Sequence, residues 1–138
     1  MHPGKIIITE FDKKRLEQMI ANHLLAHNPD VEYLMDLNQE LGRAEIVLPE
    51  EIPHDVVTMN SKVTIRDIDT KEVESYSLAF PAGADIAQNK ISILSPVGTA
   101  LIGCRVGDRV EWRVPAGIRK LEVVKIDYQP EAAGDYHL

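Results

Sequence analysis

The hydrophobic residues of the first part of the chain recur with the period of an α-helix. They form two sets separated by Asn28-Pro29, a pair that favours the start of a second helix. Helices joined by so short a break run antiparallel, so we expect residues 1–48 to form a helical hairpin, a short coiled coil. Each helix would have about 15 residues and a length of roughly 22 Å. The two sets are Phe11, Leu16, Met19, Ile20 and Leu24, then Leu34, Leu37, Leu41 and Ala44.

Local signals predict where this helical segment begins and ends. Thr9 can cap the first helix, because Asp12 follows three positions later and the apolar Ile8 precedes it. Pro49 and Pro53 cannot lie inside a helix. We therefore interpret the segment between the two prolines as a short linker.

From Val56 onward the pattern changes to a period of two, which indicates β-strands. Segments 62–66, 75–80 and 110–114 alternate between hydrophobic and polar residues. Together with a last strand to Tyr128, they predict a small antiparallel sheet over residues 53–138. The chain as a whole is expected to have an α+β fold.

Two irregularities are predicted within this second segment. Ser95-Pro96 has the residue types of an N-cap and first helical position, so a short helix should begin there and end before Gly103. In the last strand the inward-facing set changes phase, which predicts a β-bulge near Val123-Val124. The expected inward residues are Leu121 and Val123 before the bulge and Val124, Ile126 and Tyr128 after it.

Composition and charge exclude several classes of protein. The 138 residues include 22 acidic and 15 basic ones, giving a net charge of -7. A surface of this charge does not favour direct binding of nucleic acid, which requires cations against the phosphates. The single cysteine, Cys104, excludes a disulfide framework, and no apolar run is long enough to cross a bilayer. We expect a cytoplasmic protein with no membrane partner.

Three segments of the second half, in the same order, resemble a known family. Residues 91–108 (ISILSPVGTALIGCRVGD) are similar to the signature of the C-terminal domain of Gre-type bacterial transcript cleavage factors. Residues 53–61 (PHDVVTMNS) and 128–135 (YQPEAAGD) resemble the Rnk branch of the Gre-like family, whose members are named as regulators of nucleoside diphosphate kinase.

The resemblance implies a fold and a partner. Gre-like factors combine a domain similar to FK506-binding proteins with an antiparallel coiled coil. The domain docks at the rim of the RNA polymerase secondary channel, and the coiled coil enters the channel. By this resemblance Ser95, Pro96 and Val97 would contact the polymerase rim, although Leu94 stands where the family has an acidic residue.

The hairpin tip, expected at Asn28, Asp30 and Glu32, has two interpretations. In the cleavage factors, acidic tip residues help to hold a catalytic Mg²⁺ in the polymerase. Alternatively, Asp30 and Glu32 stabilise the positive end of the second helix dipole, which we favour because an arm of roughly 22 Å is short. The resemblance to Rnk then implies a regulator that competes with Gre-type factors without stimulating cleavage. We expect no catalytic residues, metal or cofactor.

Two other functions remain open at this stage. An FK506-binding fold could act as a peptidyl-prolyl isomerase, but fold alone is a weak argument and the chain has few aromatic residues for the required pocket. Direct binding to nucleoside diphosphate kinase is the other alternative, and an indirect link to that enzyme through transcription is equally compatible with the residues.

Overall fold

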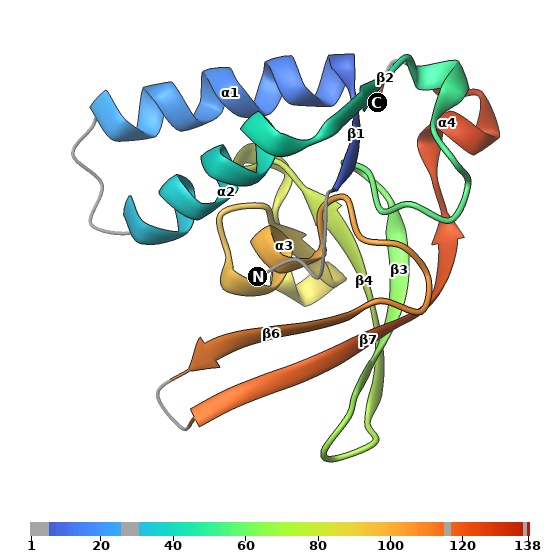
Figure 1. The fold of residues 1–138 in the computed structure, drawn as a ribbon. Coiled ribbons are helices and arrows are strands. Elements are labelled where there is room, and N and C mark those ends of the chain that lie inside the picture. Colours follow the sequence, from blue (N-terminus) through green and yellow to red (C-terminus); the bar gives the residue numbers. More distant parts are fainter. Residues whose placement is uncertain (1–5, 26–30, 115–116, 137) are drawn as a thin grey trace.

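The structure, a computed structural model, describes residues 6–25, 31–114, 117–136 and 138 (Figure 1). The helices α1 and α2 lie side by side and pack over one end of a β-sheet (Figure 1). We call these two helices the arm, and the segment from residue 52 onward the sheet domain. The elements are β1 (Ile7–Thr9), α1 (Glu10–Leu25), α2 (Val31–Arg43), β2 (Glu45–Val47), β3 (Lys62–Asp67), β4 (Val73–Ala79), β5 (Lys90–Ser92), α3 (Pro96–Leu101), β6 (Arg109–Val114), β7 (Gly117–Tyr128) and α4 (Pro130–Ala133), with 3-10 turns at Pro49–Glu51, Pro81–Gly83 and Ile86–Gln88.

The main sheet is mixed, so the prediction of an antiparallel sheet is wrong for one pair of strands. Its order in the described part of the chain is β5-β4-β3-β7-β6, and β5 runs parallel to β4. After β4 the chain does not return directly as a hairpin. Two 3-10 turns carry the chain back along β4 before Asn89, at φ 57°, directs it into β5. This crossover makes the pairing parallel.

A second, two-stranded sheet was not predicted. Residues 7–9 pair in parallel with residues 45–47, so Ile8 lies opposite Ile46. Ile8 was expected only as the apolar residue before a helix cap, and it is instead part of a strand on which α1 begins directly. The strands bring the start of α1 and the end of α2 together.

The predicted bulge in β7 is confirmed, and it changes which residues face inward. The register with β3 passes from Ile65–Val123 to Thr64–Lys125, which leaves Val124 unpaired and exposed. After the bulge Ile126 packs against the core, as predicted, whereas Val124 is the extra residue and does not face inward. This irregularity lets one long strand pair with β3 on one side and β6 on the other.

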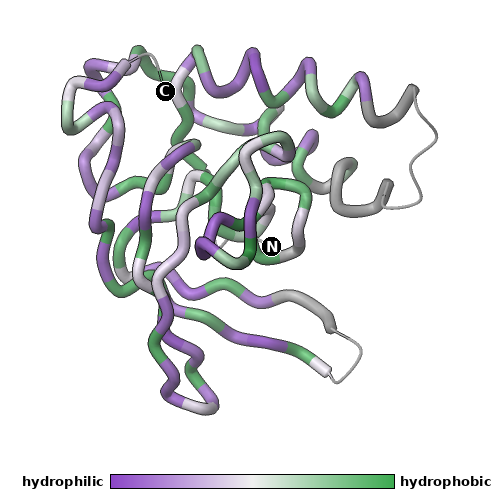
Figure 2. The backbone as a smooth tube through the Cα atoms, turned by 180° about the vertical axis from the view of Figure 1, so that it is seen from behind, coloured by the Kyte–Doolittle hydropathy of each residue, from purple (hydrophilic) through white to green (hydrophobic). Residues whose placement is uncertain are grey.

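A single hydrophobic cluster underlies both the arm and the sheet domain. Figure 2 shows hydrophobic segments where the helices meet the sheet, and alternating hydropathy along the strands. The arm and β1 contribute Ile8, Leu16, Ile20, Leu37 and Leu41, and the sheet domain contributes residues such as Met59, Leu78, Leu101, Cys104 and Val123. Burial of these side chains fixes the arm against the sheet domain along much of the length of α1.

The end of α3 is also where β1 meets the sheet domain. Gly103 has φ 76°, a conformation that favours glycine. A Cβ atom at this position would lie 2.4 Å from the Cβ of Ile6, so no side chain fits there. The predicted role of Gly103 in stopping the helix is confirmed, and its lack of a side chain also admits Ile6.

Candidate functional site

The predicted cap of α3 is confirmed in detail. The Ser95 hydroxyl accepts a hydrogen bond from the Gly98 N–H at 3.0 Å and donates one to the Ser92 carbonyl at 2.7 Å. Pro96 is the first residue of the helix, as the sequence predicted. These bonds hold the loop before α3 in one conformation.

Gly98 allows α3 to lie directly against that loop. A Cβ atom at position 98 would stand 2.2 Å from the Ser92 carbonyl oxygen, closer than any real contact. The Thr99 hydroxyl adds a hydrogen bond to the Ile93 carbonyl at 2.8 Å. The helix is therefore in backbone contact with the strand that precedes it.

Of the predicted contact residues, Ser95 and Val97 are half-buried, and Val97 packs against the hydrophobic cluster. Leu94, where the family has an acid, also packs against this cluster. The backbone of Pro96 is described but its side chain is not. Ser95 uses its hydroxyl within the loop, so a partner would meet a preformed helix start rather than a free side chain.

The predicted tip residues fall largely outside the described part of the chain. Asn28 and Asp30 lie in the segment 26–30, and only the backbone of Glu32, in the first turn of α2, is described. The two interpretations of these acids, metal positioning and helix-dipole stabilisation, remain predictions.

The described residues offer little chemistry for catalysis or metal binding. Within this part of the chain, no three His, Cys, Asp or Glu side chains are grouped so that they could hold a metal ion. Cys104 is buried, and the loss of water around its thiol raises its pKa to about 12, so it is unreactive near neutral pH. No helix in the described residues is long and apolar enough to cross a membrane.

A polar cluster that sequence reasoning missed joins the base of α1 to the sheet domain. The Asp12 side chain is completely buried. One carboxylate oxygen accepts the Met59 N–H at 3.1 Å, and the other accepts a hydrogen bond from Arg15. Burial away from water raises the pKa of Asp12 to about 6, even though both bonds favour the charged form.

Arg15 extends this cluster to the end of the chain. Its guanidinium also donates to the main-chain oxygen of Leu138 at 2.8 Å. The Phe11 and Phe80 rings lie 3.9 and 4.7 Å from its central carbon, distances typical of cation–π contacts. One side chain thus touches α1, the end of β4 and the C-terminal segment.

The turn at residues 58–61 makes the other hydrogen bonds of the cluster. Asn60 donates to the same Leu138 oxygen at 3.1 Å, and the Thr58 hydroxyl donates to Glu131 of α4 at 2.7 Å. We call Asp12, Arg15, residues 58–61, Glu131 and Leu138 the junction cluster. The two Rnk-like segments of the sequence, 53–61 and 128–135, meet here.

The C-terminal segment is packed rather than loose. Gln129 is buried and donates to the carbonyls of Pro53 and Val56 at 2.8 and 2.7 Å, and Pro130 is buried. The hydroxyl of Tyr128 donates to Asp135 at 2.5 Å, which raises the pKa of Tyr128 to about 12. Through Gln129, this polar segment is bound to the main chain of residues 53–56.

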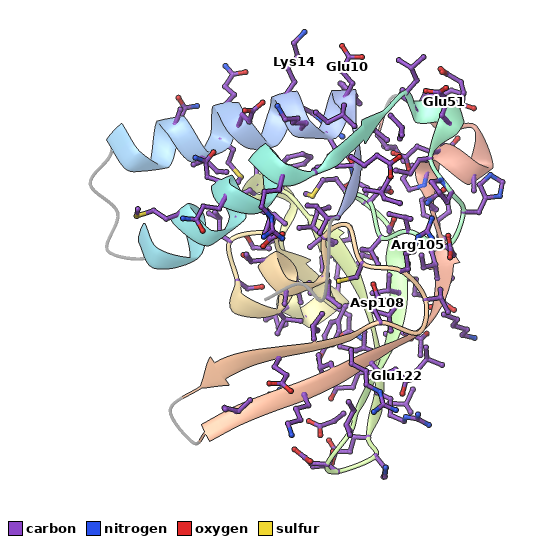
Figure 3. All side chains as sticks on the ribbon, viewed as in Figure 1. Glu10, Lys14, Glu51, Arg105, Asp108 and Glu122 are labelled. Carbon is purple, nitrogen blue, oxygen red and sulfur yellow. The ribbon has the colours of Figure 1, made fainter. Side chains whose placement is uncertain are left out.

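A groove of about 350 Å³ borders the junction cluster, lined by Arg15, Gln18, Met19, Asn22 and Phe80. Figure 3 shows Glu10 and Lys14 of α1 pointing away from the sheet domain. The spacing of Asp12, Leu16 and Ile20, four residues apart, was the signal that could have revealed the cluster. A carboxylate on the buried face of an amphipathic helix needs a partner from elsewhere in the fold.

Comparisons with known proteins agree on one family. The family described as "Transcription elongation factor, GreA/GreB, C-term" matches residues 52–128, and "Rnk N-terminus" matches residues 5–47. The chain is 44% identical to the "Regulator of nucleoside diphosphate kinase" of Escherichia coli (strain K12) over 134 residues, 96% of each protein.

More distant similarity extends to elongation factors. "Transcription elongation factor GreA" of Syntrophotalea carbinolica is 39% identical over 95 residues, covering 69% of this chain and 60% of that protein. A solved structure, "Prokaryotic transcription elongation factor GreA/GreB from Nitrosomonas europaea", has a TM-score of 0.75 and 42% identity, covering 90% of this chain and all of that one. The similarity therefore includes both the arm and the sheet domain.

Proposed function

Because the chain belongs to the GreA/GreB family of transcription factors, with the N-terminal segment of its Rnk branch, we propose that it binds RNA polymerase in the cytoplasm and regulates transcription elongation. The observation that carries this proposal is the 44% identity to a Rnk-type regulator over 96% of both chains. Such a match includes the arm, the junction and the sheet domain, so it supports a shared mode of action.

The start of α3 is the proposed docking surface for the rim of the polymerase secondary channel. Ser95, Pro96 and Val97 form this surface in the proposal. The hydrogen bonds of Ser95 and the close approach of Gly98 support it, because they preorganise the loop before any partner arrives. In this proposal residues 53–138 form the docking domain, with an architecture related to FK506-binding proteins.

In the proposal residues 1–48, which contain the arm, form a short antiparallel hairpin that would enter the channel. With 16 and 13 residues, α1 and α2 are about 24 and 20 Å long. Leu16 and Ile20 of α1 are buried against the sheet domain, so only part of that length can project beyond it. A short reach follows from both facts.

The length of a GreA relative supports a shorter reach for the arm of this protein than for that of the relative. The matched 95 residues are 60% of the Syntrophotalea protein, so that protein has about 158 residues. About 63 of its residues lie outside the match, whereas about 43 of the 138 residues of this chain do. Twenty more residues shared by two helices would lengthen a hairpin by roughly 15 Å. We propose that Asn28, Asp30 and Glu32 at the tip stop short of the polymerase metal, and that this protein blocks the channel without stimulating transcript cleavage.

The proposed action needs no enzymatic step. The relatives are named as regulators and elongation factors, which is consistent with a protein that acts by binding. A link to nucleoside diphosphate kinase, which the name of the Escherichia coli relative mentions, would be indirect in this proposal, through transcription.

The test is competition with a GreA protein for core RNA polymerase, followed by a cleavage assay on backtracked complexes. The protein should displace GreA and suppress cleavage, and it should not cleave by itself. Pro96→Glu should weaken the displacement, whereas Ile86→Glu, at a position 71% exposed elsewhere on the sheet domain, should not. Acceleration of cleavage that is lost in Asp30→Asn would contradict the proposed reach.

A further inference from the structure

We propose that Asp12 and Arg15 are positioning residues, which fix the direction of the arm relative to the sheet domain through the junction cluster. Their consequence at the polymerase rests on the proposed function, because an arm must leave the docking surface at a defined angle to enter a channel. Their effect on the arm itself is a property of this protein alone.

Apolar contacts hold the arm in place without specifying one direction. Leu16 and Ile20 are stabilised by burial, which is non-directional and tolerates small rotations. Hydrogen bonds are directional and weaken steeply when they are bent. A rotation that separates Asp12 from the Met59 N–H leaves this buried N–H and one carboxylate oxygen without their hydrogen bond, which is unfavourable away from water. The polar bonds therefore restrict the arm to one orientation.

Arg15 fixes a second point of the same junction. Its planar guanidinium bonds to Asp12 on its own helix and to the Leu138 oxygen, and it lies between the rings of Phe11 and Phe80. Asn60 also donates a hydrogen bond to the Leu138 oxygen. Arm and sheet domain are thus joined at two separate points, Met59 and Leu138, which is sufficient to oppose both tilt and rotation of α1.

Stability alone does not account for this cluster. The raised pKa of Asp12 means that its ionised form is destabilised by burial at neutral pH. Apolar residues of similar volume are often as stabilising as a buried ion pair, or more so. A carboxylate at this position is explained by the orientation that it specifies.

The experiment measures the orientation directly. Nitroxide labels at Ala21 on α1 and Lys120 on β7, both exposed, report the distance between arm and sheet domain by pulsed electron paramagnetic resonance. The native Cys104 is buried and its pKa is about 12, so it does not compete for the label. Because Ala21 lies about 17 Å from the start of α1, a rotation of roughly 15° displaces the label by roughly 4 Å.

Asp12→Ala should shift or broaden the distance distribution by up to roughly 4 Å, and Arg15→Lys, which cannot keep both bonds and the ring contacts, by less. The matched control is Lys13→Ala, which removes a 3.2 Å ion pair to Glu17 on the same helix without touching the sheet domain. Its distribution should equal that of the unsubstituted protein. Thermal unfolding is recorded for each variant, and distances are compared only for folded protein.

Unchanged distributions in folded Asp12→Ala and Arg15→Lys would overturn the inference. If Asp12→Ala does not fold, the distance distribution of Arg15→Lys tests the inference instead. That variant is expected to fold, because the side chain at position 15 is partly exposed and lysine keeps its charge. In the GreA competition, a variant whose arm adopts the competent direction a tenth of the time should bind roughly tenfold more weakly. Failure of the unsubstituted protein to compete would reject the proposed function and leave the distance result to decide this inference.

Discussion

The helices α1 and α3 begin with the same kind of cap and use it differently. In each, a hydroxyl accepts the N–H of the residue three positions later: Thr9 from Asp12 at 3.1 Å, and Ser95 from Gly98 at 3.0 Å. At α3 that third residue has no side chain, and the helix closes onto its own preceding loop. At α1 it is a carboxylate, which binds the Met59 N–H in the sheet domain.

The difference shows that the residue at the third helical position decides whether the helix start contacts only its own preceding loop or also a distant segment. Gly98 permits backbone contact with Ser92, so α3 and its loop form one rigid unit. Asp12 makes the start of α1 part of a junction between distant segments. Four predictions test this comparison, from the largest expected effect to the smallest.

Gly98→Ala should be the most damaging change. The added methyl would meet the Ser92 carbonyl oxygen, which belongs to the main chain and cannot move alone, so we expect a loss of about 3 kcal/mol in the free energy of unfolding. Gly42→Ala is the control, because Gly42 lies in α2 with open space around it and alanine favours helix by roughly 0.5–1 kcal/mol. Urea denaturation of both variants measures these opposite effects, and equal effects would show that the close approach is unimportant.

The carboxylate of Asp12 should make stability depend on pH. Its pKa is about 6 in the folded protein and 3.8 in the unfolded chain, so the folded state binds more protons between these values. The free energy of unfolding should therefore fall as the pH rises from about 4.5 to 7, by about 2 kcal/mol. Asp12→Asn should remove this slope.

The difference in pH dependence between the unsubstituted protein and Asp12→Asn separates the effect of Asp12 from that of other acids. Asp67 and Asp127 accept hydrogen bonds that lower their pKa values, so the stability that they contribute is lost only at more acidic pH, below the unfolded value. Chemical denaturation at several pH values gives the two curves. Parallel curves for Asp12→Asn and the unsubstituted protein would contradict the role of burial.

The caps themselves should contribute less. Thr9→Ala and Ser95→Ala each remove one hydroxyl acceptor at a helix start, which typically costs about 1 kcal/mol. Thr9→Ser and Ser95→Thr retain the acceptor and serve as controls. Calorimetry should show lower unfolding temperatures for the alanine variants than for their controls, and no difference would mean that water replaces the hydroxyl.

The smallest effect is expected on the outer side of α1. Lys13→Ala breaks the exposed pair with Glu17, and pairs of this spacing contribute only roughly 0.2–0.5 kcal/mol. The loss should shrink further at 1 M salt, because exposed charges are screened. A larger loss in urea titrations would indicate that Lys13 also supports the junction, contrary to the comparison.

The features that the sequence predicted correctly are those that depend on residues close together in the chain. The caps at Thr9 and Ser95, the start of α3 at Pro96 and the bulge near Val124 depend on neighbouring residues, and each is present. The order of hydrophobic periods, helical and then alternating, likewise gave the α+β class.

The errors concern pairings between distant segments. The strand at residues 7–9 finds its partner at 45–47, and β5 enters the sheet parallel to β4 after a crossover; neither pairing leaves a local trace. The spacing of Asp12 could have revealed that it is buried, but not its partner, since Met59 offers only a main-chain N–H, which any residue type would supply. The docking residues Ser95, Pro96 and Val97 came from a resemblance, and their contact with polymerase remains a prediction.

The contact between Ile6 and Gly103 has an evolutionary consequence. The isoleucine side chain fills the volume that a side chain at position 103 would need, so the two positions share one space. Substitutions there are epistatic: a larger residue at 103 becomes tolerable only after position 6 has become smaller, and even then it bears the strain of a positive φ. Lineages that diverge at this pair should therefore acquire the two changes in a fixed order.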